Sequence, residues 1–280
     1  MADTRPLTTS AFLHELGVPD LAAATCPFDP GYDLTTVVGH LAQSARLMSR
    51  LKVSMACWLV ADEAVTRAKV RAAREHRVPT VSGGGPFEIA AAQGKLPQFL
   101  DLCADIGFTR IEAGQGFTDT HLDPGDVVRL ARVRGLQVQY ELGGKHDGAF
   151  TPAVVDRLVA LGDTWLAAGA EELVIEARES AQNVGLFAAD GTYNAALAER
   201  LADAFGLERV VFEAPDKRSQ FALLDHLGPR VQLSNVRLEE LLRVEIYRRG
   251  LHSDAFAKPL LRPGPAVVDL DAAALLAGAS

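Results

Sequence analysis

Short apolar runs alternate with amphipathic segments along the chain. The clearest run is Leu173–Ile175, whose neighbouring positions are all apolar, as is typical of a strand buried on both faces. Similar runs recur, and segments with the helical spacing of apolar residues lie between them. We predict strands at residues 21–25, 51–55, 78–82, 108–112, 136–141, 173–176, 209–213 and 231–233. Helices are predicted at 34–48, 62–76, 87–94, 95–106, 123–134, 152–168, 193–205, 217–227 and 237–249.

This regular succession indicates a single α/β domain, a (β/α)8 TIM barrel spanning residues 1–280. A doubly wound sheet is the alternative, but the Gly-x-Gly-x-x-Gly turn that usually follows its first strand is missing. A short helix at Ser10–Leu16 precedes the barrel. An apolar, proline-punctuated C-terminal tail, about residues 255–280, is expected to pack against the barrel or a neighbouring subunit, and we expect a homo-oligomer.

The composition is that of an ordinary globular protein and excludes two classes of partner. Hydrophobic residues make up 48% of the 280 positions, which is ample for a core, and 23% are charged. The net charge of −8 disfavours a nucleic-acid partner, and no apolar run is long enough for a membrane span. Three cysteines without CxxC spacing indicate reduced thiols rather than disulfides. Because the first residues do not resemble a secretory leader, we expect a cytoplasmic protein.

Charged residues gather where the predicted strands end. Four glutamates end strands in similar register: Glu112, Glu141, Glu176 and Glu213. The carboxyl ends of barrel strands converge on one mouth, where so many carboxylates would raise each other's pKa values. A divalent cation removes this repulsion, and oxygen ligands favour Mg2+ over zinc, so we expect two or three of the four to reach the ion. The alternative is that nearby lysine or arginine side chains neutralise one or two of them.

Two turns are candidate anion sites. Gly83–Gly85 opens a predicted helix, where free backbone N–H groups would face a ligand. Ser234–Asn235 opens the last long helix, after the eighth strand, where barrels often hold a phosphate. The alternative for each is an ordinary helix cap or tight turn. The charged loop Glu176–Ser180 is either part of the site or a solvated loop whose Glu and Arg residues pair with each other.

Several clustered motifs resemble the phosphosulfolactate synthase family. They lie between about Asp29 and Asp254 and comprise Gly84–Ala90, Gln93–Lys95, Gly107–Phe108, Ile111–Glu112, Glu141–Gly143 with Lys145, Ile175–Ser180, Phe212–Pro215, Gly228–Pro229, Leu233, Asn235, Glu245, Arg248 and Gly250–Leu251. The resemblance implies a (β/α)8 barrel and a Mg2+-dependent addition of sulfite to phosphoenolpyruvate. Plant heat-stress-associated proteins look like distant relatives with no settled catalytic role, so the fold by itself does not establish catalysis.

The chain departs from the family's usual residues near the expected site. Pro30 stands where the family has a lysine, and Lys52–Trp58 keeps the lysine of its motif but loses the glycines. The further departures are at Gly114, Gln115, Gln232 and His252. Because cations that would hold phosphate and sulfite are lost while the carboxylates and Lys52 are kept, the pattern favours retained chemistry on an altered substrate.

The implied reaction assigns roles to the charged residues. Sulfite attack on an enolpyruvate leaves negative charge that spreads into the carboxylate, where Mg2+ can stabilise it as a Lewis acid. Lys52 is the expected general acid because it projects from a strand; the alternative is an ion-pair partner for a strand-end glutamate. Lys145 and Arg178 are expected to orient the carboxylate or the incoming anion.

The remaining assignments complete a site for a small anionic substrate. The expected metal ligands are Glu112, Glu141, Glu176 and Glu213, the last with less support. The expected substrate-binding residues are Asp29, Ser82, Gly84, Glu179, Ser234, Asn235, Arg248 and His252. Alternatively, Glu179 and Glu88 hold the cationic side chains in place. The leading hypothesis is a Mg2+-dependent lyase; the alternatives are a different addition at the same site and a barrel without catalysis.

Overall fold

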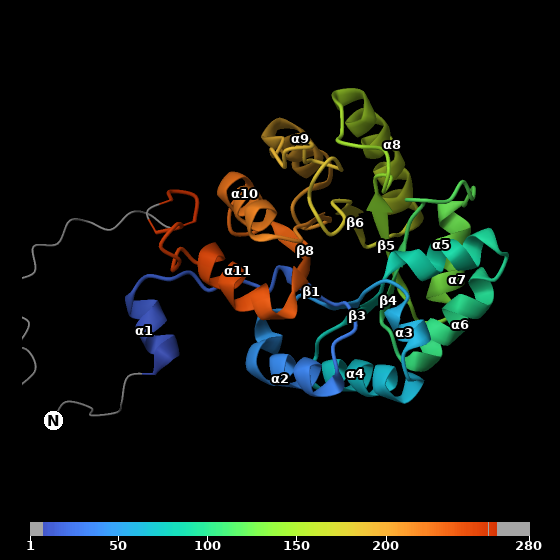
Figure 1. Cartoon of the computed structure of the whole chain (residues 1–280), viewed down its shortest axis with the longest axis horizontal. Helices are drawn as coiled ribbons and strands as arrows, with labels where there is room; N and C mark the ends of the chain where they lie inside the picture. Colours follow the sequence, from blue (N-terminus) through green and yellow to red (C-terminus); the bar gives the residue numbers. More distant parts are fainter. Residues whose placement is uncertain (1–7, 257, 262–280) are drawn as a thin grey trace, which may run out of the picture.

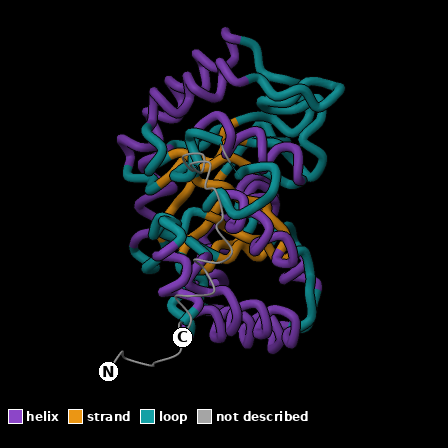
Figure 2. The backbone as a smooth tube through the Cα atoms, turned by 90° about the vertical axis from the view of Figure 1, so that its left-hand side faces the viewer, coloured by secondary structure: helices purple, strands orange, loops and turns teal. Residues whose placement is uncertain are grey.

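The computed structural model describes residues 8–256 and 258–261 and confirms the predicted (β/α)8 barrel. Its eight parallel strands form a closed sheet, because β8 pairs with β1 as well as with β7. Helices surround the strands (Figure 1), and the side view shows the strands enclosed by this outer layer (Figure 2). The greater part of the predicted C-terminal tail, from residue 262 onward, lies outside the described residues.

The strands lie close to their predicted places. They are β1 (Thr25–Asp29), β2 (Leu51–Val53), β3 (Thr80–Ser82), β4 (Arg110–Ala113), β5 (Gln137–Leu142), β6 (Glu172–Ile175), β7 (Val210–Glu213) and β8 (Gln232–Arg237). The first prediction is wrong in extent, because β1 begins only at Thr25 and continues through Pro27. A proline is tolerated there because the register against β8 shifts between Cys26 and Pro27.

Helices fill the intervals between strands as predicted, and one short helix, α3, was not predicted. They are α1 (Thr9–Glu15), α2 (Leu34–Ser44), η1 (Ala45–Leu47), α3 (Cys57–Val60), α4 (Glu63–Glu75), α5 (Gly84–Ala92), α6 (Leu96–Ile106), α7 (Pro124–Arg132), α8 (Pro152–Ala168), α9 (Ala195–Phe205), α10 (Lys217–Leu227), η2 (Leu238–Glu240) and α11 (Leu241–Arg248). Several begin where an Asp or Thr side chain accepts a hydrogen bond from the first turn, as Asp62, Asp123 and Thr151 do. In the described part of the chain no helix combines the length and the apolar character needed to cross a membrane.

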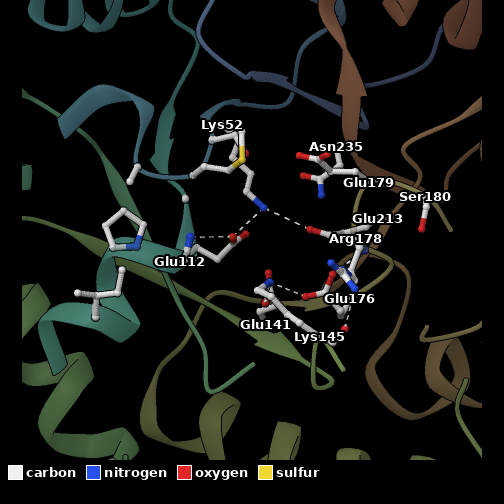
Figure 3. Close-up of a pocket in the computed structure, with 18 residues that line it drawn as sticks. Lys52, Glu112, Glu141, Lys145, Glu176, Arg178, Glu179, Ser180, Glu213 and Asn235 are labelled. Carbon is white, nitrogen blue, oxygen red and sulfur yellow. Dashed lines mark hydrogen bonds and ion pairs between the residues drawn. The ribbon is translucent and has the colours of Figure 1, made fainter. Parts of the chain in front are cut away.

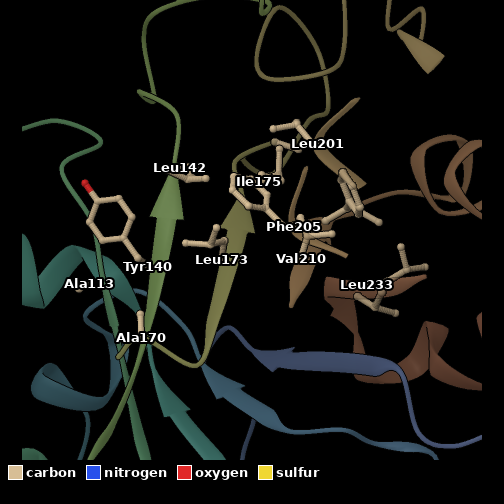
Figure 4. Close-up of a cluster of buried hydrophobic side chains, with 14 of the residues drawn as sticks. Ala113, Tyr140, Leu142, Ala170, Leu173, Ile175, Leu201, Phe205, Val210 and Leu233 are labelled. Atoms are coloured by element: carbon tan, nitrogen blue, oxygen red, sulfur yellow. The ribbon is translucent and has the colours of Figure 1, made fainter. Parts of the chain in front are cut away.

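The hydrophobic core lies between the strands and the helices, outside the barrel. Alternation along β5 and β6 points Tyr140, Leu142, Leu173 and Ile175 outward into this layer (Figure 4). The Tyr140 ring stacks on Trp165 of α8, with 4.0 Å between ring centroids. The inward positions of the same strands hold Gln139, Glu141 and Glu172, with Val174 as an apolar exception.

Charged side chains fill the amino-terminal end of the barrel. Arg50 and Arg110 both approach Glu172 to 2.5 Å, and all three residues are buried. Gln232 of β8 accepts a hydrogen bond from Arg50, and Gln137 of β5 accepts one from Arg110. This network joins four strands and the start of β2 at the end of the barrel opposite the mouth.

Candidate active site

The mouth of the barrel, at the carboxyl ends of the strands, contains a cavity of about 590 Å³. Its lining comes from the ends of seven strands or the loops after them, as expected for a barrel enzyme. The labelled residues in Figure 3 are Lys52, Glu112, Glu141, Lys145, Glu176, Arg178, Glu179, Ser180, Glu213 and Asn235. The structure thus brings together the four predicted glutamates and the three predicted cationic residues.

Lys52 lies on the floor of the cavity between two glutamates. Its Nζ is 2.7 Å from Glu112 Oε1 and 3.3 Å from Glu213 Oε1. Burial by itself would lower the pKa of Lys52, but the carboxylates of Glu112, Glu213 and Glu141 outweigh it and raise that pKa. Lys52 is therefore a protonated ammonium group at neutral pH.

Lys145 joins the other two glutamates. Its Nζ donates to Glu141 Oε1 at 2.8 Å and to Glu176 Oε2 at 2.6 Å (Figure 3). Here too burial would lower the lysine pKa, and the charges of Glu141, Glu176 and Glu213 raise it. The four glutamates are thus shared between two lysines, which is the arrangement expected under the alternative of neutralisation by nearby cations.

The loop after β6 supplies backbone donors to the same carboxylates. The N–H groups of Ala177 and Arg178 donate to Glu213 Oε2 at 3.0 and 3.1 Å, and that of Arg178 also donates to Glu176 Oε1 at 2.6 Å. Arg178 has a φ of 56°, which non-glycine residues rarely adopt. Its side chain is exposed and donates to the Lys145 carbonyl oxygen at 3.3 Å. The guanidinium group therefore has donors left for a ligand.

The cavity lining carries an excess of negative charge. Among the described residues it contains five carboxylates, with Glu179 as the fifth, against three cations, a net charge of −2 when all are ionised. Burial, together with the carboxylates of Glu213 and Glu141, raises the pKa of Glu176 far above the ordinary carboxyl value. One divalent cation would neutralise this excess.

The donor atoms suit magnesium, although they do not surround a common point in this conformation. Within residues 8–256 and 258–261, no three His, Cys, Asp or Glu side chains are grouped closely enough to hold a metal ion. Lys145 instead occupies the space between Glu141 and Glu176. Glu141 Oε2 has no hydrogen-bond partner among the described residues, and the available donors are all carboxylate oxygens, the ligands that Mg2+ prefers. In donor chemistry and charge, the site fits the ion.

Two residues predicted to bind substrate face away from the cavity. Asp29 is fully buried and pairs with Lys69 of α4 at 2.7 Å, and it also accepts from the N–H groups of Gly31 and Tyr32. Ser82 shares its outward orientation with its register partner Ile111 and lies beside Cys103 of α6. The predictions for Asp29 and Ser82 are corrected, because the two-residue period of a strand turns each toward the helices.

The predicted anion sites differ from expectation. Ser234 and Asn235 do not open a helix, because β8 continues to Arg237. Ser234 is buried inside the barrel, and Asn235, with a φ of 56°, lines the cavity. Gly84 does begin α5, but its N–H donates to Glu112 Oε1 at 3.1 Å. The start of α5 therefore positions a glutamate.

The last two predicted substrate-binding residues lie outside the mouth. Arg248 is fully buried at the amino-terminal end of the barrel, where it bonds to the Pro229 and Val231 carbonyls and to Glu245. His252 packs against the rings of Phe221 and Tyr247 on α10 and α11. These predictions are corrected too, since the chain after β8 passes down the outside of the barrel. The departure at Gln232 is at the same far end.

Glu88 has different surroundings from those expected, whereas Glu179 lines the cavity as its predicted substrate-binding role requires. Glu88 is buried and accepts from the Phe117 N–H and the Thr118 hydroxyl, so it holds the loop after β4 rather than a cationic side chain. Glu179 is exposed at the rim of the cavity.

The sequence-based prediction missed four apolar residues of the cavity wall: Met55, Ala56, Pro86 and Ile89. These residues follow the strand that carries Lys52 or lie beside the Gly83–Gly85 turn, and this position could have indicated that they line the cavity. Apolar residues at such positions are equally typical of the hydrophobic core, however. Lys69, the partner of Asp29, was also missed, because nothing distinguishes it from the other charged residues of its helix.

Comparison with known proteins gives one consistent result. The family model for (2R)-phospho-3-sulfolactate synthase matches residues 19–254. The phosphosulfolactate synthase of Methanocaldococcus jannaschii is 30% identical over 235 residues, covering 84% of this chain and 94% of that protein. The phosphosulfolactate synthase of Methanothermobacter thermautotrophicus is 31% identical over 193 residues, covering 69% of this chain and 75% of that protein.

Solved structures add support for the barrel. KGPDC from Streptococcus mutans, in complex with D-R5P, superposes with a TM-score of 0.51 at 12% identity, covering 86% of this chain and all of that one. At this level of identity the likeness concerns the fold alone.

Proposed function

Because the chain belongs to the phosphosulfolactate synthase family, we propose that it is a Mg2+-dependent lyase that forms a carbon–sulfur bond. It adds sulfite, or a related sulfur nucleophile, to an alkene conjugated with a carboxylate, such as phosphoenolpyruvate. The observation that carries the proposal is the position of Lys52, a buried ammonium group fixed between Glu112 and Glu213 on the cavity floor.

Lys52 has the properties that the final proton transfer needs. Attack of sulfite on the terminal alkene carbon forms the C–S bond and breaks the C=C π bond, and the electron pair moves toward the carboxylate. The resulting aci-carboxylate is a much stronger base than an amine, so the Lys52 ammonium can protonate the carbon that bears the carboxylate. Lys52 then regains its proton from water.

The other charged residues bind and orient the reactants. Glu141, Glu176 and Glu213 are the residues that would hold magnesium once Lys145 leaves the space between Glu141 and Glu176, and the bound ion would supply Lewis-acid stabilisation of the charge on the carboxylate. Arg178 is the guanidinium group with free donors at the rim, and its planar fork suits a carboxylate. Lys145 keeps Glu141 and Glu176 together.

A barrel without catalysis is the weaker alternative. Lys52 and Lys145 are held among carboxylates in a cavity, and three residues that line it have positive φ angles: Met55, Arg178 and Asn235. Buried ion pairs and strained backbone cost stability, and their concentration at one cavity favours function.

Turnover of alkene carboxylates with sulfite and Mg2+ tests the proposal. Phosphoenolpyruvate and unphosphorylated 2-substituted acrylates are incubated with the protein, and sulfonate products are identified by carbon and phosphorus NMR. Lys52→Met is expected to lower the rate by about 10²- to 10⁴-fold, the usual contribution of a general acid.

Lys95→Met is the matched control, because Lys95 is exposed at the start of α6 and does not line the cavity. Circular dichroism checks that both variants are folded. Equal rates in Lys52→Met and the unmodified protein, or no sulfonate from any alkene, would contradict the proposal.

A further inference from the structure

One wall of the cavity is apolar. It consists of Met55 after β2 and of Pro86 and Ile89 in α5. The charged residues of the lining come from β2, β4, β5 and β7 and from the loops after β5 and β6. Met55 and Ile89 are 47% and 48% exposed, so they present hydrophobic surface to whatever enters. A site that held only small polyanions would gain nothing from such a wall.

The backbone of the apolar wall is closely packed on neighbouring elements. Met55 has a φ of 53°, and its backbone packs so closely on Gly83 that a Cβ there would lie 2.7 Å from the Met55 nitrogen. The next helix, α3, is anchored by Trp58, whose buried ring contacts Phe108 with 5.2 Å between centroids. The chain therefore keeps a strained residue at this place instead of relaxing it into the core.

The cations of the cavity are too few for a phosphorylated substrate. Lys52 and Lys145 each already contact two glutamates. Arg178 is the remaining cation of the lining, and of its guanidinium nitrogens one donates to the Lys145 carbonyl. With five carboxylates also present, even a bound Mg2+ would bring the lining only to neutrality when all five are ionised. Phosphate, carboxylate and sulfite together would place several uncompensated negative charges there.

We propose that the natural alkene carries a single carboxylate and an apolar substituent in place of the phosphate. The inference rests on the function proposed above and concerns the same site and the same addition. The carboxylate meets Arg178 and the metal, and the apolar group lies on Met55, Pro86 and Ile89. Sulfite adds to the CH2 carbon of CH2=C(R)COO⁻, the π bond breaks, and Lys52 protonates the other carbon, giving a 3-sulfopropanoate substituted at carbon 2.

A competition between two alkenes tests this inference. Each is supplied with sulfite and Mg2+: 2-phenylacrylate, which has a carboxylate and an apolar ring, and phosphoenolpyruvate. We expect kcat/KM for 2-phenylacrylate to be at least about ten times higher, since the difference corresponds to burying a few methylene-sized groups. Equal or higher kcat/KM for phosphoenolpyruvate would overturn the inference while leaving the proposed function intact. If neither alkene yields a sulfonate above the rate without enzyme, the proposed function fails and this inference fails with it.

Variants of the wall separate it from the catalytic residues. Met55→Lys adds a cation to the wall on an unbranched side chain only one atom longer, and we expect it to raise KM for 2-phenylacrylate and lower KM for phosphoenolpyruvate, each about tenfold. Leu59→Lys is the matched control, because Leu59 is 46% exposed on α3 but does not line the cavity. The same KM values in Met55→Lys as in Leu59→Lys would overturn the inference.

Discussion

Two lysines and four glutamates set the charge state of the mouth at the level of single residues. Each lysine contacts two carboxylates, and each of the four carboxylates contacts one lysine. Buried ion pairs of this kind add little net stability, because the desolvation of both partners offsets their attraction. The arrangement is consistent with the proposed function, which needs a protonated lysine and carboxylates that bind a metal ion.

Glu176→Gln tests the excess of negative charge. The pKa of Glu176 is raised in the folded state, so its contribution to stability is present below its unfolded pKa and is lost as the pH rises. We therefore compare the two proteins in EDTA at about pH 5 and about pH 9. The free energy of unfolding of the unmodified protein should decrease over this range by about 1–3 kcal/mol more than that of Glu176→Gln. Urea denaturation at several pH values measures both.

Saturating Mg2+ is expected to remove most of this fall, because the cation favours the ionised carboxylates of the folded state. Parallel pH profiles for the two proteins in EDTA would contradict the prediction, and an unchanged profile in Mg2+ would contradict the proposed metal site.

Lys69→Met tests the structural assignment of Asp29. The substitution leaves a fully buried carboxylate without its cation, and we expect a loss of about 3–5 kcal/mol. Adding Asp29→Asn should restore part of this stability, since the two residues form one interacting pair. Chemical denaturation of both single variants and the double variant measures the coupling. A higher KM in Asp29→Asn, with stability unchanged, would instead support the original sequence-based prediction that Asp29 binds substrate.

At the level of elements, the packing of the loop after β2 on the start of α5 shapes the cavity. Gly83→Ala places a Cβ 2.7 Å from the Met55 nitrogen, so we expect it to cost about 1–3 kcal/mol and to lower activity by displacing the apolar wall. Gly85→Ala is the matched control, because its Cβ would meet no atom within 4 Å, and it should be neutral or stabilising by up to about 1 kcal/mol. The midpoints of thermal unfolding of the two variants test this prediction, and equal midpoints would contradict it.

Element types were predictable from the sequence, but the direction of individual side chains was less so. A buried strand shows no alternation of apolar and polar residues, so a sequence run does not tell which positions face inward. Asp29 and Ser82 were misassigned for this reason, whereas the strand-end glutamates were placed correctly in the mouth. The end of β8 was missed because Asn235 adopts a positive φ, after which the strand continues to Arg237.

At the level of the whole molecule, Arg248 closes the barrel at its amino-terminal end. Its guanidinium donates to carbonyls before β8 and to Thr25 of β1, so it joins the first and last strands. We expect Arg248→Met to cost about 3–5 kcal/mol, because it removes the side-chain donor from the Pro229 and Val231 carbonyls and one of the two cations paired with the buried Glu245. Arg46→Met, at an exposed position, is the control. Urea denaturation measures the loss; a raised KM with normal stability would contradict the structural role.

The closed barrel and the place of its mouth followed from the sequence, because strand and helix periodicities are local properties that repeat along the chain. By contrast, the end of the barrel at which a residue after β8 lies is not determined by the local sequence. Arg248 and His252 belong to segments that match the family, but their location depends on the path of the chain after β8, which no pattern in the sequence records.

The separation of the two charged ends of the barrel has a consequence for the evolution of this protein. The network of Arg50, Arg110 and Glu172 holds one end, and the residues that meet the substrate occupy the other. Substitutions of exposed side chains at the mouth can therefore accumulate with little loss of folding stability, and a new specificity can arise without prior changes in the rest of the barrel. The departures at Met55 and Gly114, beside a kept Lys52, are the kind of divergence that such a division of labour permits.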